Sequence, residues 1–425
     1  MTIAIFIGSL LAAMALGVPI AFALLISGAV LMWQLGMFNA QIIAENVIHG
    51  ADSYPLLAVP FFLLAGEIMN AGGLSRRLIN LAMTLIGHIH GGLGYVTILA
   101  AVMMAALSGS AVADAAMLAA LLLPMMIAAG HDPARSAGLI SASSIIAPVI
   151  PPSIGFIIFG VAANVSISRL FMAGIAPGLM LGLALWLTWW WLSRRENVKP
   201  QARRSGAEVL TALREASFAL VMPVIIIAGL KMGVFTPTEA GVVAAVYAFA
   251  IATFVYRELT LQQLYKAFAD AARTSAVVMF LVAAAAVSAW LITVANIPQQ
   301  VVALLDPLIE NPVLLMVAIM VLVMMVGTAL DLTPTILILV PVLMPLVKAA
   351  GIDPVYFGVM FMINCSIGLI TPPVGVVLNT VAGVGRLKMD QVIVGVLPFM
   401  LAQFLLMFLL VLFPQLVMTP ARLFY

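Results

Sequence analysis

Two stretches of the sequence, "IAPVIPPSIG" at residues 146–155 and "IGLITPPVGV" at residues 367–376, each place a Pro-Pro pair inside a long apolar segment. A single proline in a helix interior costs about 3 kcal/mol, because it removes a backbone hydrogen bond and clashes with the preceding turn. Two breaks of the same kind in one chain therefore indicate a requirement that both segments share.

The composition indicates a polytopic membrane protein. Of the 425 residues, 65% are hydrophobic and only 8% are charged, and apolar stretches long enough to span a bilayer recur along the chain. The first apolar segment has neither a basic flank nor a small-residue cleavage site, so we expect it to be retained as a membrane helix. The single cysteine, Cys365, excludes an internal disulfide and a cysteine cluster for metal.

The apolar pattern predicts ten spans and two re-entrant hairpins. The hairpins are residues 91–129 and 313–350, because "SGSAVAD" (108–114) and "GTALDLTP" (327–334) interrupt these stretches halfway with small and polar residues. The spans are expected at residues 3–17, 18–36, 53–72, 134–165, 169–193, 216–232, 236–256, 273–296, 354–385 and 391–418.

The basic residues give the chain an orientation. Residues 194–215 are the most basic and least apolar part, so the positive-inside rule places them in the cytoplasm, and counting crossings from there places both termini outside. Two weakly amphipathic stretches, 38–52 and 259–275, are too polar to span, and we expect them to lie along the interface as arms that brace a scaffold.

The two Pro-Pro pairs belong to an internal repeat. Pro151 and Pro372 lie 221 residues apart (372 − 151 = 221). The same offset relates Pro124 to Pro345, Gly130 to Gly351, Asp132 to Asp353, Pro133 to Pro354 and Pro152 to Pro373. The repeat predicts a first half, 1–195, a cytoplasmic linker, 196–215, and a second half, 216–425.

The repeat is expected to be inverted in the membrane, because each half contains an odd number of crossings. One hairpin then enters from the cytoplasm and the other from outside, and their tips converge beside the broken helices 134–165 and 354–385. Backbone groups freed at membrane depth are tolerated where they line a cavity or bind an ion or substrate. For one break alone, an ordinary proline kink is the alternative. The predicted fold class is an all-α polytopic membrane protein with an inverted-topology repeat, two re-entrant hairpins and two broken helices.

The hairpin tips offer oxygen atoms to a cation. Ser108 and Ser110 occupy the first tip, and Gly327 and Asp331 the second, and hard cations such as sodium prefer hydroxyl, carboxylate and carbonyl oxygens. The repeat pairs Ser110 with Asp331, so we expect the two tips to differ in net charge. Asp114 also flanks a tip, and for any one such acid a structural hydrogen bond is an equal alternative.

Polar residues in the broken helices are candidates for substrate contact. Ser144 lies in the first broken helix, and Asn364 and Ser366 lie in the second. Backbone amides at such breaks can hold a carboxylate, which favours an anionic organic substrate. The histidines lack a metal-ligand spacing, and the sequence contains no Walker loop, dinucleotide fingerprint or nucleophile elbow, so an enzyme is disfavoured. We expect a lipid membrane and no nucleic acid as surroundings.

Six motifs together resemble the large membrane subunit of TRAP (tripartite ATP-independent periplasmic) transporters. They are "LAGEIMNAGGLS" (64–75), "LSGSAVADAA" (107–116), "APVIPPSIGF" (147–156), "FTPTEAG" (235–241), "DLTPTILILVPVLMP" (331–345) and "GLITPPVGVVLN" (368–379). The resemblance implies an elevator-type secondary transporter of a bacterial inner membrane that imports an organic acid with a sodium gradient. It also implies two partners, a periplasmic substrate-binding protein and a small four-helix membrane subunit, the latter expected as a separate polypeptide.

Carried over by position, the resemblance implies two sodium sites and a substrate cavity between the tips. One sodium site would be formed by Ser108, Ser110, Ile145 and Pro148, and the other by Gly327, Asp331, Gly368 and Thr371. The candidates for substrate contact are Ser110, Ser144, Asn364 and Ser366. Within the family, the sequence most resembles the subset that handles sugar-derived acids such as diketogulonate, rather than sialic acid or C4-dicarboxylates.

Two other functions stay open at this point. A stand-alone ion-coupled carrier of the same wider superfamily, such as a dicarboxylate or gluconate permease, would need no partner protein. A membrane-embedded enzyme or an assembly scaffold would show no sodium-dependent uptake in vesicles.

Overall fold

The computed structural model describes residues 2–194, 196, 198, 200–304 and 306–424, and this part of the chain is helical throughout. Residues 195, 197 and 199, at the boundary between the predicted first half and linker, lie outside the described residues. Eight helices in the described part are long and apolar enough to cross a membrane. The predicted all-α polytopic class is confirmed.

The first half contains a paired start, a connecting run of helices, a hairpin and a broken helix. In chain order these are α1 (Thr2–Ala15), α2 (Ile20–Gln34), α3 (Ala40–Ala51), η1 (Tyr54–Leu57), α4 (Ala58–Ala71) and α5 (Leu74–Ile86). The hairpin is α6 (Gly92–Ser108) and α7 (Ala111–Ala128), the broken helix is α8 (Pro133–Ser144) and α9 (Ile154–Ala163), and the last helix is α10 (Ile167–Ser193).

The second half repeats this order. It begins with α11 (Gly206–Lys231), α12 (Pro237–Ala250), the π-helical turn η2 (Ile251–Val255), α13 (Leu261–Val294), α14 (Ile297–Leu304) and α15 (Asp306–Ile309). The hairpin α16 (Pro312–Gly327) and α17 (Leu332–Ala349) follows, then the broken helix α18 (Pro354–Gly368) and α19 (Val376–Gly385), then α20 (Met389–Leu412) and α21 (Gln415–Phe424).

The offset of 221 residues relates the helices as well as the prolines. Ala111 and Leu332 start the second hairpin limbs, and Pro133 and Pro354 start the broken helices. Both Pro-Pro bonds are cis. Each broken helix also begins in the same way, because an aspartate side chain caps its first turn. The two halves therefore share one local design from the hairpin onward.

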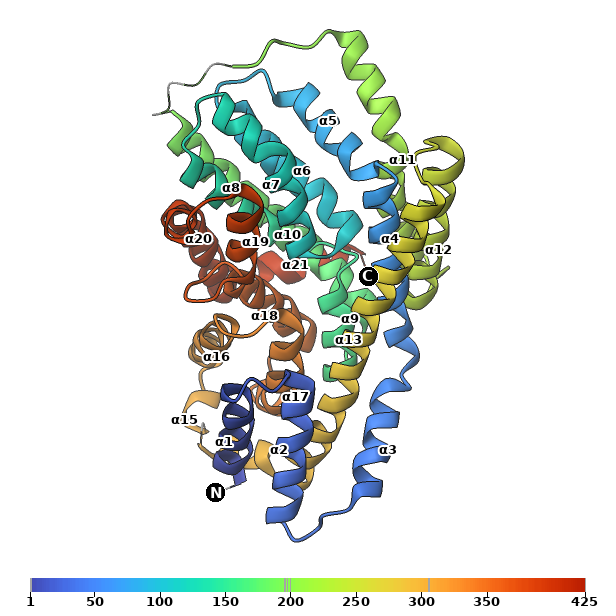
Figure 1. Cartoon of the computed structure of the whole chain (residues 1–425). Helices are drawn as coiled ribbons and strands as arrows, with labels where there is room; N and C mark the ends of the chain where they lie inside the picture. The colour runs from blue at the N-terminus through green and yellow to red at the C-terminus, as the bar shows by residue number, and fades with distance from the viewer. Residues whose placement is uncertain (1, 195, 197, 199, 305, 425) are drawn as a thin grey trace.

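The helices form two packed groups. The hairpins and broken helices interlock across the halves, since α7 packs on α19 and α17 packs on α9. The other group is α1–α4 with α11–α13, in which α13 contacts α2, α3 and α4. Figure 1 shows α13 running along one side of the molecule from α12 to α2, beside the hairpin group. This arrangement is that of a brace against which a second body packs.

The two predicted arms fold differently from each other. The first arm is a separate helix, α3, because Asp52, Ser53 and Pro55 interrupt the chain before α4. The second arm, 259–275, is not separate, since it continues directly into the following span as the 34-residue helix α13. No proline or glycine occurs within α13, so nothing in its sequence stops the helix.

Three element boundaries differ from the prediction. Helix α11 begins at Gly206, inside the predicted linker, because Ser205 and Glu208 form a capping box there. The predicted last span, 391–418, ends at Leu412. The pattern did not predict α5, which has 13 residues and two arginines and is therefore too short and too polar to be recognised as a span.

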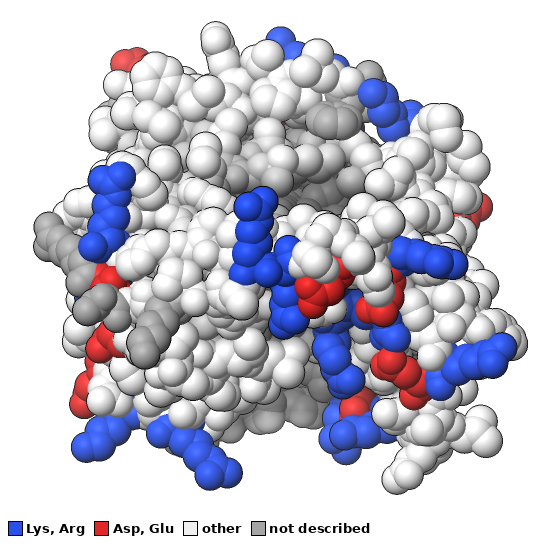
Figure 2. Space-filling view, turned by 90° about the horizontal axis from the view of Figure 1, so that it is seen from above, with Lys and Arg blue, Asp and Glu red and all other residues white. Residues whose placement is uncertain are grey.

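The unpredicted helix α5 joins the halves by charge. Arg77 Nη2 lies 2.6 Å from Glu258 Oε1, in the connection between η2 and α13. The same guanidinium lies 3.7 Å from the centre of the Tyr256 ring, a cation–π geometry. Figure 2 shows acidic side chains lying among Lys and Arg on the end of the molecule where α11 begins.

The Arg77–Glu258 pair predicts a pH-dependent contribution to stability. The hydrogen bond from Arg77 holds the pKa of the Glu258 carboxyl below its usual value of 4.5. Stabilisation by a carboxyl with a depressed pKa is present above its unfolded pKa and is lost as the pH falls through its folded pKa. We expect Glu258→Gln to lower the free energy of unfolding in detergent by at most about 1 kcal/mol at neutral pH, because the pair is partly exposed.

The measurement is thermal denaturation of the wild type and Glu258→Gln at neutral pH and well below pH 4.5, where the difference should vanish. The Arg77→Met and double variants complete a mutant cycle. A difference that persists undiminished at the acidic pH would contradict the electrostatic origin.

Candidate functional site

The inner hairpin tip rests directly on the first helix break. Helix α6 ends at Ser108, and Gly109 turns the chain with a left-handed φ of 60°. A Cβ on Gly109 would lie 2.6 Å from the carbonyl oxygen of Pro152, so only glycine fits at this position. The Ser110 hydroxyl then accepts the backbone amide of Ala113, at 3.4 Å, and starts α7.

The outer hairpin tip meets the second break through backbone contact. A Cβ on Gly368, the last residue of α18, would lie 2.9 Å from the carbonyl oxygen of Gly327, the last residue of α16. Asp331 precedes α17, but its side chain makes no capping hydrogen bond. Its carboxylate is therefore not consumed by the helix that it precedes.

The carbonyls freed by the two breaks find partly local partners. The Ser153 hydroxyl donates to the Pro148 carbonyl at 2.5 Å, and the Thr371 hydroxyl donates to the Ile367 carbonyl at 2.8 Å. Satisfying backbone groups in this way is what makes an interrupted helix tolerable at membrane depth.

Both tips and both breaks line one cavity of about 160 Å³. Its lining residues are Leu63, Gly109, Ser110, Ala111, Val112, Pro148, Ile154, Gly155, Thr274, Val278, Asp331, Leu332, Thr333 and Leu369. The structure therefore brings three predicted site residues, Ser110, Pro148 and Asp331, to one place from distant parts of the sequence. Sequence reasoning missed the contribution of α4 and α13, which supply Leu63, Thr274 and Val278.

The other candidates for substrate contact lie outside this lining. The hydroxyls of Ser144 and Ser366 donate to carbonyls one turn back in their own helices, both at 2.7 Å. The Asn364 amide donates to the Met320 carbonyl at 2.5 Å. All three side chains are buried, so they hold helices together in this conformation.

The remaining ion candidates stand at the breaks. Ile145 is fully buried at the end of α8. Thr371 follows the end of α18 and lies beside the Met400 sulfur, 3.7 Å from its hydroxyl. In both halves these positions are those where the helix gives way to the Pro-Pro segment.

An acid completes the inner tip. The Ser108 hydroxyl donates to Asp114 Oδ1 at 2.6 Å, and Asp114 is only 1% exposed. The expectation that the two tips differ in net charge does not hold, because each has one carboxyl group, Asp114 or Asp331. The residues one turn beyond Ser110 and Asp331 carried this signal, since 114 and 335 are also 221 apart.

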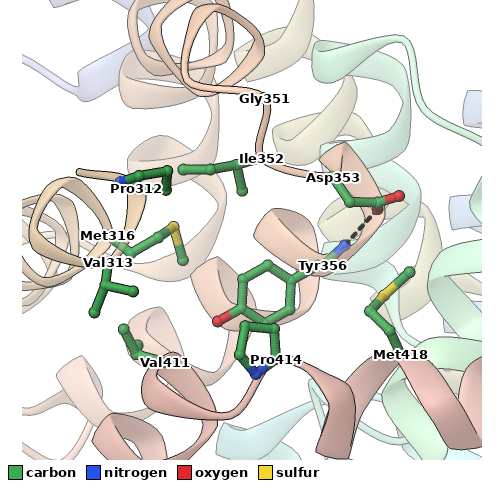
Figure 3. A pocket seen from close by; sticks show the side chains of 10 residues that line it. All are labelled: Pro312, Val313, Met316, Gly351, Ile352, Asp353, Tyr356, Val411, Pro414 and Met418. Atoms are coloured by element: carbon green, nitrogen blue, oxygen red, sulfur yellow. Dashed lines mark hydrogen bonds between the residues drawn. The ribbon is translucent and has the colours of Figure 1, made fainter. Parts of the chain in front are cut away.

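A larger apolar cavity of about 240 Å³ lies at the base of the outer hairpin (Figure 3). Its polar groups are already used, because the Asp353 carboxylate accepts the amides of Val355 and Tyr356 at 2.8 and 3.0 Å. The Tyr356 hydroxyl donates to the Leu410 carbonyl at 2.9 Å. No lining group is left to neutralise a carboxylate, so this cavity does not suit an organic acid.

The donor set at the tips suits a hard monovalent cation. Within the described residues, no three His, Cys, Asp or Glu side chains gather in a way that could hold a transition metal. The tips offer hydroxyls, carbonyls near the breaks and single carboxylates, which are oxygen ligands of the kind that sodium accepts.

Comparison with known proteins agrees with this geometry. Residues 7–416 match the family described as "Tripartite ATP-independent periplasmic transporter, DctM component". The chain is 57% identical to the 2,3-diketo-L-gulonate TRAP transporter large permease protein YiaN of Escherichia coli K12, over 99% of both chains. It is 37% identical to the sialic acid TRAP transporter large permease protein SiaM of Vibrio cholerae, over 96% of both chains.

A solved structure shares the fold. The YdaH transporter of Alcanivorax borkumensis, described as having an unusual topology, superposes with a TM-score of 0.62 over 87% of this chain and 86% of its own, at 17% sequence identity.

The close approach of tips and breaks predicts the effect of adding one methyl group. Gly109→Ala and Gly368→Ala each place a Cβ against backbone, so we expect each to destabilise the hairpin group by about 1–3 kcal/mol and to abolish transport. Gly383→Ala, in α19, is the control, because nothing lies within 4 Å of its added Cβ. Thermal denaturation and uptake would measure both effects, and wild-type behaviour of the first two variants would show that the tips do not pack on the breaks as described.

Proposed function

The chain belongs to the DctM family of tripartite ATP-independent periplasmic transporters, and we propose that it is the large membrane subunit of a sodium-coupled importer of an organic acid. The observation that carries this proposal is the cavity in which both hairpin tips and both broken helices present oxygen atoms. Such an arrangement suits ion and substrate binding, since irregular backbone at membrane depth is kept where it lines a site.

Sodium is the coupling ion in this proposal. Ser108, Ser110 and the carbonyls near Ile145 and Pro148 would hold one ion, while Gly327, Asp331, Gly368 and Thr371 would surround a second. A bound cation would supply positive charge that draws an anionic substrate to the tips. Binding of both to the same group of helices lets them share free energy, which is the requirement for coupled transport.

A sugar-derived acid is the proposed substrate class. The support is similarity, because the chain is much more similar to the diketogulonate permease than to the sialic acid permease. The cavity of about 160 Å³ is smaller than the 300–1,000 Å³ typical of small-molecule pockets, so the acid would enter when the tips separate.

Movement of the hairpin group against the brace would carry the site across the membrane. The tips face Thr274 and Val278 of α13, near the predicted cytoplasmic end of that span. The offset of 221 residues pairs these with Ser53 and Leu57, at the predicted outer end of α4. Ser53 lines a cavity of about 400 Å³ between η1, the turn from α9 to α10, and the start of α12. This cavity is the space toward which the tips would travel in the opposite state.

We place the protein in a bacterial inner membrane with two partners, a small four-helix membrane subunit and a periplasmic substrate-binding protein. The support is membership of a family whose description names a tripartite, periplasmic system. The same membership disfavours an enzyme, since the relatives are permeases. A stand-alone dicarboxylate or gluconate-type permease is the alternative, and it would transport without either partner.

The first test of the function is uptake into proteoliposomes that contain the chain and its small subunit. With 2,3-diketo-L-gulonate and the cognate binding protein outside, we expect uptake to require an inward sodium gradient and to proceed without ATP. Asp331→Asn keeps the size of the side chain but removes its charge, so the half-saturating sodium concentration should rise at least about tenfold.

Glu45→Gln, an acid removed from the surface of α3, is the matched control and should leave the sodium titration unchanged. Undiminished uptake with a proton gradient in sodium-free medium would overturn the choice of ion. Uptake without the binding protein would favour the stand-alone permease.

The second test concerns movement. With Cys365 replaced by serine, the pair Ala111→Cys and Val278→Cys should cross-link in the conformation described here, because both positions line the cavity at the tips. The pair Leu332→Cys and Leu57→Cys occupies the repeat-related positions and should cross-link in the opposite state. Each cross-link should stop uptake, and a reductant should restore it. Failure of the second pair to react during active transport would contradict the proposed movement.

A further inference from the structure

The inner hairpin tip is backed by a buried acid that does not line the cavity. Asp114 lies in the first turn of α7, one turn beyond Ser110, and is 1% exposed. Its Oδ1 accepts the Ser108 hydroxyl at 2.6 Å, while the cavity is lined by Gly109 and Ser110 in front of it. Asp114 therefore acts on the tip from behind, through Ser108.

The hydrogen bond fixes the direction in which Ser108 can act. A serine hydroxyl has one hydrogen and two lone pairs. The hydrogen is directed to Asp114, and the Ser110 amide donates to the Ser108 oxygen at 3.3 Å, a long bond that occupies one lone pair. One lone pair is left to accept, so the carboxylate turns the Ser108 oxygen into an acceptor for a cation.

The second oxygen of Asp114 is unsatisfied. Within the described residues, Oδ2 is one of a small number of buried side-chain atoms without a hydrogen-bond partner. A buried acid that lacks partners is costly, and more so inside a membrane. A positive charge bound beside Ser108 would offset that cost, which gives the free oxygen a physical reason to be there.

The repeat supplies an independent argument. The positions 110 and 114 in the first half correspond to 331 and 335 in the second. The first pair is Ser then Asp, and the second is Asp then Thr, so hydroxyl and carboxyl groups exchange places one helical turn apart. The Thr335 hydroxyl donates to the Asp331 carbonyl at 2.8 Å, which ties the two positions of the outer tip together. Each tip thus keeps one acid and one hydroxyl on a single turn.

We propose that Asp114 is a positioning residue of the inner tip, which orients the Ser108 hydroxyl toward a bound sodium ion and gives this tip the negative charge that Asp331 gives the outer one. The proposal rests on the proposed sodium coupling and extends it to a residue that does not touch the ion.

The test is a sodium chloride titration of the thermal stability of the purified chain in detergent, with choline chloride keeping the ionic strength constant. A ligand that binds the folded state raises stability with its concentration, so the titration reports sodium affinity without any transported acid. Asp114→Asn keeps an acceptor for Ser108 but removes the charge. We expect its half-maximal sodium concentration to rise at least about tenfold, with sodium-free stability close to that of the wild type.

Two further variants separate positioning from folding. Ser108→Ala removes the hydroxyl that Asp114 orients, so it should weaken sodium binding, and the double variant should show less than the sum of the two effects. Ser136→Ala removes another buried hydroxyl, at the end of α8 away from the break, and should leave the sodium titration unchanged. If Asp114→Asn does not assemble, an unchanged titration in Ser108→Ala is enough to overturn the proposal.

The outcomes distinguish this inference from the proposed function. A wild-type protein that is not stabilised by sodium would remove the sodium coupling itself. A wild type that responds to sodium, together with an Asp114→Asn variant that responds equally, would leave the coupling intact and overturn only the role of Asp114. A loss of sodium-free stability in Asp114→Asn with a normal titration would assign the acid a structural role.

Discussion

The structure depends on one constraint, which is that a backbone group left unpaired inside a membrane costs several kcal/mol. Each Pro-Pro segment interrupts a helix and frees such groups. The protein answers with hydroxyls from nearby residues, Ser153 and Thr371, and with a hairpin tip packed against each break. The glycines at the contacts are needed because backbone meets backbone there. The cavity follows from this packing, since two tips that each cover a break bring four interrupted segments to one point.

The halves share a frame but fill it differently where the hairpins meet the surface. In the first half, Trp189 donates to the Gly91 carbonyl at 2.9 Å, and His131 Nδ1 lies 2.6 Å from a carboxylate oxygen of Glu196. The positions related to Trp189 and His131 by the repeat are Leu410 and Ile352. Without the indole and the polar pair, the second half has the apolar cavity of Figure 3 at this place. Side-chain size and polarity, rather than backbone course, separate the two ends of the molecule.

The brace and the hairpin group have different kinds of contact. Helix α13 is continuous over 34 residues and touches α2, α3 and α4, so a shift of one part would be transmitted along its whole length. Its related segment in the first half is divided between α3 and α4 by Asp52 to Pro55. The hairpins interlock with the broken helices of the opposite half, which ties that group into one packed body. A rigid body beside a long brace is an arrangement that permits relative sliding.

The sequence by itself determined the membrane class, the hairpins, the breaks and the repeat, because apolar length, proline pairs and a constant offset are local or periodic signals. It also brought Ser110 and Asp331 forward as tip residues. It missed α5, the continuity of α13 and the lining from Leu63, Thr274 and Val278, because amphipathic and inter-half contacts leave no such signal. Only the tertiary structure decided that Ser144, Asn364 and Ser366 bond to helix carbonyls and that Asp114 backs Ser108. The physical reason is that a side chain has many possible partners in the sequence, and packing selects one.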